Sequence, residues 1–405
     1  MEASSFADID LDAEAGSPSG VLSRVRNAPR LVAFALGLLA VVSFYVYDTT
    51  LATGFSTVGG WDVSLMDWLT LFATVGIVAF VVVPVILDVG VLRRFWANYP
   101  KDAISLVSLA VVSIVGLLGV FGPVLMGTPE VSLQVSRQPP VYTSVSSTVV
   151  PVCEGPVVGG HCHGTWKHPL GTTRAGESVL EWTIYGARTA VQFAVVTLAI
   201  MAPIAVAVGG LSGYYGGQVD DVLSTYVDVQ SAIPAVVIYF FVVYFLGPSL
   251  FALVLIFGLF SWEEMARTVR TSVVSEKSEG YVTAARSAGA SDLTILRRHI
   301  LPNVSSAVVT TVSTAVPKLI LIEALFSFVG LSGDQSYSWG QLVRRGVAFG
   351  TGGGQGGPPM GAFDPLVFEA SWWIAVIPAL ALTIAVLALT LFGDAVQEAV
   401  DPWSR

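Results

Sequence analysis

Charged residues are scarce in this chain of 405 residues: Asp, Glu, Lys and Arg together make up 12% of it, whereas soluble domains contain roughly 25%. Hydrophobic residues make up 54%. The formal net charge of −9 argues against a nucleic-acid partner. The apolar runs extend over about 17 residues or more and do not alternate with period two, which excludes the pattern of a β-barrel. The sequence predicts an all-α integral membrane protein.

Motifs of enzymes are missing as well. The chain contains neither GxxxxGK[ST] nor HExxH, so it has no nucleotide site of its own and no zinc-protease helix. Residues 210–213 and 330–333 match the GxSG pattern of rhomboid proteases, but such a serine needs a histidine base within the bilayer. All histidines lie outside the predicted spans: His161, His163, His168 and His299. We therefore expect no catalytic residues, no bound metal and no cofactor on this chain.

Cysteine is nearly absent. Cys153 and Cys162 are the only two, and they lie in a polar segment that we expect outside the membrane, where an oxidising compartment permits a disulfide. A metal site is the alternative, because His161, Cys162, His163 and His168 are ligand types suited to zinc or nickel. Their spacing fits no standard ligand set. A solvated loop with chance histidines is a third interpretation, and the sequence leaves all three open.

The hydropathy pattern divides the chain into membrane spans and polar segments. Residues 1–30 form an acidic tail that cannot bury enough apolar surface to fold. Two additional spans are expected within 31–88, a first core span at 103–129, and an external loop or small lobe at 130–177. The remaining predicted spans are 189–219, 229–262 broken into two at Gly247-Pro248, 304–331, and 370–393 with Trp372 and Trp373 as an interfacial anchor. A glycine-rich loop lies at 352–361.

The distribution of Lys and Arg beside these spans predicts the orientation in the membrane. With the N-terminus inside, the inner segments hold 13 basic residues and the outer segments hold 6. Both termini and the polar stretch 278–303 are then cytoplasmic, and the lobe at 130–177 is external. The inner residues are Arg24, Arg26, Arg30, Arg93, Arg94, Lys101, Arg267, Arg270, Lys277, Arg286, Arg297, Arg298 and Arg405, and the outer ones are Arg137, Lys167, Arg174, Arg188, Arg344 and Arg345.

The cytoplasmic stretch from Ser278 to Asn303 reads SEGYVTAARSAGASDLTILRRHILPN. Small residues precede Gly289, which permits a sharp break between two short helices. They also let a helix approach a partner closely. Ser291 or Asp292 can cap the second helix, and basic residues near its end suit the helix dipole. Between two apolar spans, such a helix pair is suited to contact another protein.

This stretch resembles the EAA loop of permease subunits of binding-protein-dependent ABC importers: Glu-Ala-Ala, three residues, Gly, nine residues, Ile, one residue, Leu-Pro. The spacing matches, with Thr283 in place of the Glu and His299 in place of the Ile. The resemblance implies the type I ABC importer transmembrane fold, here a six-span core plus two N-terminal spans. It also implies a core permease domain at 178–405 with a cytoplasmic coupling loop at 263–303. The implied ATPase-coupling residues are Glu279, Tyr281, Thr283, Ala284, Ala285, Arg286, Gly289, Ala290, Asp292, His299, Leu301 and Pro302.

Flanking segments are similar to the dipeptide, oligopeptide and nickel branch of that family, second-permease type: 168–188, 213–217 with Asp220 and 228–234, 262–270, 323–333 with 338–340, and 393–402. The resemblance implies a multi-pass protein of the cytoplasmic membrane and import of di- or oligopeptides. It further implies as partners a second homologous permease, two ATPase subunits that bind ATP and Mg, and an external solute-binding protein. Import of nickel chelates or oligosaccharides is the alternative within this class. An ATP-independent secondary transporter is the alternative from another class, although it would not require the long cytoplasmic helix pair.

Ionisable and small residues inside the spans complete the expectations. Lys318 and Glu323 lie inside a predicted span and are therefore pathway candidates, while snorkelling toward the inner surface is the other interpretation for Lys318. Gly209, Gly213 and Gly217 recur every four residues. They form either a close-packed hinge or ordinary small-residue packing.

Overall fold

The computed structural model describes residues 29–50, 63–333, 337–347 and 371–400. The chain divides into two compact units, Met1–Arg94 and Phe95–Arg405, with the boundary inside α5 (Val89–Asn98). We describe each unit by itself. Most of the predicted acidic tail (1–30) and the whole predicted glycine-rich loop (352–361) lie outside the described residues.

The first unit contains two helical segments. The first is α2 (Pro29–Thr50), and the second runs through α3 (Leu65–Ile77), the π-helical turn η2 (Val78–Val82) and α4 (Val83–Leu87). Ser64 and Asp67 form a reciprocal capping box that fixes the start of α3. The π turn precedes Pro84, whose missing N–H cannot continue the regular hydrogen-bond ladder.

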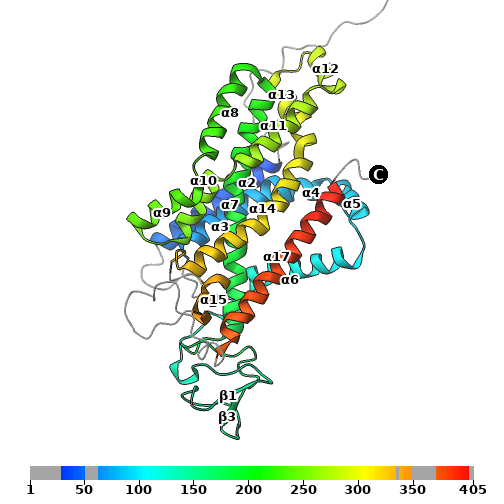
Figure 1. The fold of residues 1–405 in the computed structure, drawn as a ribbon. Coiled ribbons are helices and arrows are strands. Elements are labelled where there is room, and N and C mark those ends of the chain that lie inside the picture. Colours follow the sequence, from blue (N-terminus) through cyan, green and yellow to red (C-terminus); the bar gives the residue numbers. More distant parts are fainter. Residues whose placement is uncertain (1–28, 51–62, 334–336, 348–370, 401–405) are drawn as a thin grey trace, which may run out of the picture. The chain divides into compact units, whose positions relative to one another are not determined.

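The second unit is a helical bundle arranged around the long helix α7 (Val179–Tyr215), as Figure 1 shows. The helices α6 (Ala103–Met126), α10 (Leu250–Phe260), α11 (Glu263–Lys277) and α14 (Leu301–Val329) all pack against α7. The remaining elements are α8 (Gly217–Ser231), α9 (Ala235–Leu246), α12 (Gly280–Ser287), α13 (Asp292–Ile295), the π turn η4 (Leu296–Ile300), α15 (Trp339–Val347) and α17 (Trp373–Val400).

Six helices of the described residues are long and apolar enough to cross a membrane: Pro29–Thr50, Leu65–Leu87, Ala103–Gly122, Val179–Tyr215, Asp292–Val329 and Trp373–Val400. The pair α8 and α9, bent by 59°, is a further candidate for one broken span. These segments include most of the spans expected from the sequence. The part of 229–262 after Gly247-Pro248 is the exception, because α10 has only 11 residues before the chain breaks at Ser261 and continues as α11.

Two boundaries differ from the sequence-based expectation. The helix predicted at 189–219 begins ten residues earlier, at Val179, because Ser178 caps it by accepting a hydrogen bond from the Glu181 N–H. It ends at Tyr215, since Gly216 and Gly217 both have positive φ (66° and 52°). Gly217 therefore opens α8 and is not the third member of a glycine stripe on one helix.

The other two glycines of that stripe are packing positions. A Cβ added to Gly209 would overlap the carbonyl oxygen of Ala266, and one added to Gly213 would lie 2.7 Å from the carbonyl oxygen of Arg270. Both neighbours belong to α11, so the missing side chains allow the two backbones to touch. Gly210 is different, because its nearest contact would be Leu301 Cδ2 at 3.6 Å.

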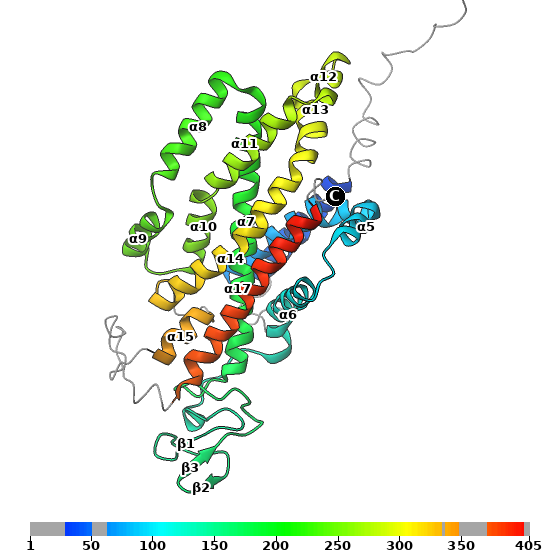
Figure 2. The same cartoon turned by 45° about the vertical axis from the view of Figure 1, so that its right-hand side comes forward.

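A small β-containing lobe precedes α7 at one end of the second unit, and α12 and α13 lie at the opposite end (Figures 1 and 2). The sheet of the lobe has the strand order β1 (Ser144–Ser146), β3 (His161–His163), β2 (Val157–Val158), and both pairs of strands are antiparallel. Val145 and Val157 both lie opposite Cys162. Cys153 and Cys162 form a disulfide, with Cα atoms 5.7 Å apart.

The lobe shares a hydrophobic core with the helix ends beside it. The cluster contains Val145, Val150, Cys162, Val179, Trp182, Leu342, Trp373 and Ile374. Trp373 is fully buried there, and its indole N–H donates a 3.1 Å hydrogen bond to the carbonyl oxygen of Thr172. The prediction that Trp373 is an interfacial anchor was therefore wrong, since this residue joins the lobe to α17.

Candidate functional site

The stretch from Ser278 to Asn303 folds into a helical hairpin whose turn depends on Gly289. Gly289 has φ of 79°. Its N–H donates to the carbonyl oxygen of Arg286 at 3.0 Å, and the Ala290 N–H donates to that of Ala285 at 3.1 Å. This pair of hydrogen bonds is the Schellman motif, which requires a left-handed residue after the helix. No atom lies within 4 Å of a Cβ added to Gly289, so the backbone and not crowding within this chain selects glycine.

The hairpin has its own apolar interior. Val282 of α12, Ile295 of α13 and Ile300 of the following turn η4 are completely buried, and η4 contacts α11. Helices of eight and four residues are too short to be stable alone, because helix formation costs conformational entropy. Burial of these apolar side chains offsets that cost. The hairpin is therefore a rigid projection from α11 and α14.

Most side chains from Thr283 to Ala290 are small, and the exposed Arg286 is the exception. Thr283, Ala284, Ala288 and Gly289 are exposed, and Ala285 and Ala290 are partly exposed. Leu293 of α13 exposes 50% of its surface. We call this set the hairpin face. A surface of small residues around one exposed leucine permits close approach by another protein's backbone.

Tyr281 connects three elements at the base of the hairpin. Its hydroxyl donates to Glu276 on α11 and accepts a 2.8 Å hydrogen bond from Asn303 Nδ2 on α14. Asn303 Nδ2 also donates to the carbonyl oxygen of His299 at 3.0 Å. Burial, and then the hydrogen bond with Glu276, raise the pKa of Tyr281, so the phenol remains protonated as a donor. Glu279 is the N-cap residue of α12 and is exposed, without a side-chain capping bond.

Tyr214 attaches the hairpin to the central helix. Its hydroxyl donates a 2.7 Å hydrogen bond to Asp292 Oδ1 in the first turn of α13. The Tyr214 side chain is buried, and Lys277 Nζ lies 5.7 Å from the centre of its ring. Arg286, also predicted as a coupling residue, is exposed next to this bond. A displacement of α13 would therefore be felt at the end of α7.

The hairpin continues into α14 through the π turn η4. The N–H of Leu301 donates to the carbonyl oxygen of Leu296, five residues back, and Pro302 follows without an N–H of its own. His299 is partly buried in this turn, Pro302 is exposed, and Arg297 and Arg298 point to solvent. Thus His299, Leu301 and Pro302 form the connection between the hairpin and the membrane helix and are not part of its face.

A bidentate ion pair joins α8 to α11 near the same end. Arg270 donates through Nε (2.6 Å) and Nη2 (2.5 Å) to the carboxylate of Asp220, which also accepts from Ser212 and Ser224. Arg267 donates to Asp228 and Ser231, each at 2.9 Å. With Gly209 and Gly213 packed on α11, these contacts make α7, α8 and α11 one unit at the base of the hairpin.

The two predicted intramembrane ionisable residues lie in different surroundings. Glu323 is 1% exposed and accepts a 2.6 Å hydrogen bond from Ser327, whose oxygen lies 2.7 Å from Ser332 Oγ. Lys318 is exposed, and its Nζ lies 3.8 Å from Glu264 Oε2. Glu323 and Lys318 do not pair with each other, since residues five positions apart lie on different faces of a helix. A role of either in a pathway stays a prediction.

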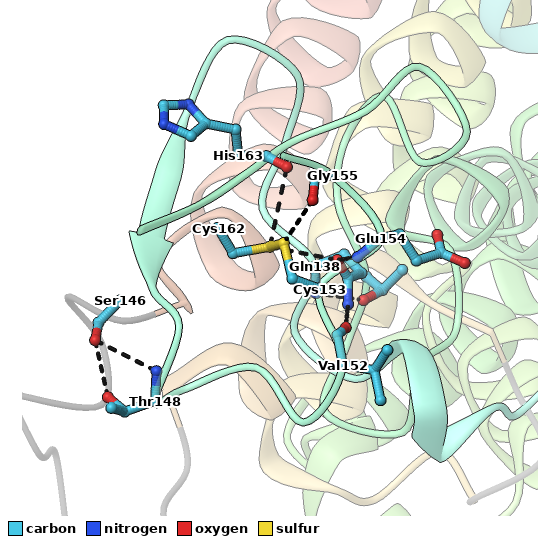
Figure 3. The surroundings of a disulfide bond; sticks show 10 residues. Gln138, Ser146, Thr148, Val152, Cys153, Glu154, Gly155, Cys162 and His163 are labelled. Carbon is cyan, nitrogen blue, oxygen red and sulfur yellow. Dashed lines mark hydrogen bonds between the residues drawn. A yellow bond between two sulfur atoms is a disulfide. The ribbon is translucent and has the colours of Figure 1, made fainter. Parts of the chain in front are cut away.

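In the lobe, Figure 3 shows the disulfide beside Gln138, whose Nε2 donates to Val152 and whose Oε1 accepts from the Glu154 N–H. Because Cys162 is bonded to Cys153, its sulfur is not a free metal ligand. The described residues contain no group of three or more His, Cys, Asp or Glu side chains placed to hold a metal ion. His168 Nε2 instead lies 3.2 Å from Glu154 Oε2.

The sequence singled out most of the hairpin but not its attachments. Tyr214, Glu276 and Asn303 were not among the predicted coupling residues, and the pairing of Asp220 with Arg270 was not foreseen. Tyr214 stands in the segment 213–217, which resembled the family pattern, so its position carried a signal. Asp292 was itself a predicted coupling residue, but its pairing with Tyr214 carried no signal, because 78 positions separate the two residues.

The fold and the site define a class: a polytopic helical membrane protein with a small-faced helical hairpin that leads into the membrane helix α14. Residues 205–405 match the family described as binding-protein-dependent transport system inner membrane component. The chain belongs to this family of permease subunits.

Three relatives each match more than half of the chain. The chain is 26% identical over 313 residues to the dipeptide transport system permease protein DppC of Bacillus subtilis, covering 76% of this chain and 85% of that protein. It is 30% identical over 239 residues to the oligopeptide transport system permease protein OppC of Escherichia coli, covering 59% of this chain and 73% of that protein. The corresponding OppC of Haemophilus influenzae is 29% identical over 239 residues, 59% of this chain and 71% of the relative.

Proposed function

We propose that this chain forms half of the translocation pathway of an ATP-driven importer of di- or oligopeptides. The names of its relatives supply the substrate class, since they are permeases of dipeptide and oligopeptide transport systems. The partners are a second homologous permease, two ATPase subunits that carry ATP and Mg, and an external solute-binding protein. Nickel chelates and oligosaccharides are the other candidates, and no described feature favours them.

The coupling role is carried by one observation, the hairpin face. Its small exposed residues stand on a buried apolar interior and are tied to α7, α11 and α14 by the bonds of Tyr214 and Tyr281. Docking of an ATPase subunit against Ala284, Ala285, Gly289 and Ala290 would turn a movement of that subunit into a movement of α14 through Leu301 and Pro302. Such a device has no chemistry of its own, which fits a permease subunit.

The orientation follows from the excess of basic residues on the hairpin side, with both termini cytoplasmic and the lobe external. In this arrangement 31–88 adds two spans to the core of 103–129 and 178–405. Protease added outside sealed cells should cleave 130–177 and spare Ser278–Asn303. Cleavage within the hairpin under these conditions would contradict the orientation.

The proposed function is tested by uptake of a labelled dipeptide in cells that retain or lack the associated ATPase genes. We expect uptake to stop when the ATPases are deleted and to return when they are supplied. Uptake that continues without them would instead favour a secondary transporter, which needs no ATPase contact.

A further inference from the structure

A pocket of about 220 Å³ lies between α7, the junction of α10 and α11, and α14. Met201, Phe257 and Leu319 form its apolar wall. Polar and charged side chains form the rest of the wall: Glu263, Glu264, Thr311, Thr314 and Lys318. Glu263 and Glu264 begin α11, whereas the other three belong to the membrane-spanning helix α14, where an ionisable group is costly to maintain and marks a functional position by default.

The hydroxyl groups in this wall are hydrogen-bond acceptors toward the pocket. Thr311 Oγ1 donates its proton to the carbonyl oxygen of Ala307 at 2.9 Å, and Thr314 Oγ1 donates to that of Thr311 at 3.0 Å. Each hydroxyl has one proton, so only its lone pairs remain for a ligand. Glu263 adds a carboxylate whose Oε2 is buried and has no hydrogen-bond partner within the described part of the chain.

The charge in the pocket is unbalanced. Lys318 Nζ lies 3.8 Å from Glu264 Oε2, so the one cation among the residues lining the pocket is opposite Glu264. Glu263 then carries the surplus negative charge. A buried carboxylate oxygen without a partner is unfavourable, and a donor cation entering the pocket would relieve that cost.

We propose that this pocket binds a primary ammonium group bearing a short apolar side chain, the chemistry of a peptide's N-terminal residue. The ammonium group donates to Glu263 and to the two threonine hydroxyls, while the side chain contacts Met201, Phe257 and Leu319. This inference rests on the proposed function in so far as it places the pocket on the route of a peptide.

Cysteine protection tests the proposal on the full chain. The sequence has two cysteines, which are bonded to each other, so Ala315→Cys at the pocket wall would supply the one free thiol. The rate at which a maleimide labels that thiol is measured in the presence of leucinamide, which has a free amino group. It is measured again with N-acetyl-leucinamide, which has no free amino group. At about ten times its Kd, leucinamide should slow labelling about tenfold by occupancy alone, and N-acetyl-leucinamide should not.

Glu263→Gln in the Ala315→Cys background should abolish the protection, and Asp221→Asn, which alters an exposed carboxylate on α8, should leave it intact. Equal labelling rates of the variants without probe show that both fold. Labelling unaffected by leucinamide, or slowed equally by N-acetyl-leucinamide, would overturn the proposal whatever the uptake assay shows. Because the labelling needs neither ATPase nor binding protein, intact protection in a chain that supports no ATP-driven peptide uptake would overturn the proposed function instead.

Discussion

The hydroxyl of Tyr214 at the end of α7 donates a 2.7 Å hydrogen bond to Asp292 Oδ1 at the start of α13. This bond connects the central helix of the bundle to the hairpin that precedes α14. Since both side chains are fixed by their own helices, the bond transmits the position of the hairpin to α7.

Tyr214→Phe removes only the hydroxyl group, which hydrogen-bonds to Asp292 and also interacts with the Arg286 side chain. We expect the variant to insert normally, to lose about 1 kcal/mol of stability, and to transport less peptide per ATP hydrolysed. The ratio of uptake to hydrolysis in proteoliposomes measures this. Tyr215→Phe is the matched control, because Tyr215 is the next residue on the same helix and is 47% exposed. Equal ratios for both variants would rule out a coupling role for the Tyr214 bond.

Gly209→Ala and Gly210→Ala test the close packing of α7 on α11. The first adds a methyl group against the Ala266 carbonyl oxygen, and the second adds one in ordinary contact with Leu301. Overpacking should cost Gly209→Ala about 1–3 kcal/mol, whereas Gly210→Ala should be neutral or slightly stabilising because alanine favours a helix. Thermal melting in detergent compares them, and the opposite order would contradict the packing described.

The lobe should lose stability in acid because of His168. Burial lowers the pKa of this imidazole. The nearby Glu154 carboxylate raises the pKa, but by less than burial lowers it, so the folded lobe favours the neutral imidazole. Below about pH 6.5 the unfolded chain binds a proton that the folded lobe does not, and stability falls until the lowered pKa is passed. Proteolysis of the lobe should accelerate between about pH 7 and pH 5. His168→Gln should weaken this dependence, and an unchanged dependence would exclude His168.

The disulfide should stabilise the lobe without affecting the hairpin. It links residues nine positions apart, and a loop of this size contributes about 2–3 kcal/mol in the chain-entropy model. Mass spectrometry of unreduced protein should find both thiols bonded. The double variant Cys153→Ser/Cys162→Ser should be cleaved faster in 130–177 and at the same rate in 278–303; free thiols in the native protein would refute the bond.

The local features of the hairpin could be predicted from the sequence because they depend on residue type. Glycine is the default residue at φ of 79°, so Gly289 marked the turn, and Pro302 marked the departure from a regular helix. Long apolar runs likewise marked most membrane helices, since their length is set by the bilayer.

Features that depend on tertiary contacts could not be predicted. Trp373 looked like an interfacial residue because its neighbours are apolar, yet the lobe covers it and supplies the Thr172 acceptor from 201 positions away. The pairing of Asp220 with Arg270 spans 50 positions. The end of α10 at Phe260, by contrast, lies two residues before the predicted end of its span at 262, where the predicted coupling loop begins.

The central claim is that the hairpin face docks an ATPase subunit, and a series at Gly289 tests it most directly. Asparagine tolerates the left-handed conformation and adds bulk to the face, whereas alanine adds little bulk but costs about 1–2 kcal/mol of strain. The measurement is ATP-driven dipeptide uptake by the reconstituted complex, with melting temperature as the check on folding. We predict that Gly289→Asn keeps a near-native melting temperature and loses uptake, while Gly289→Ala melts lower and retains part of it. Normal uptake by Gly289→Asn would contradict the account.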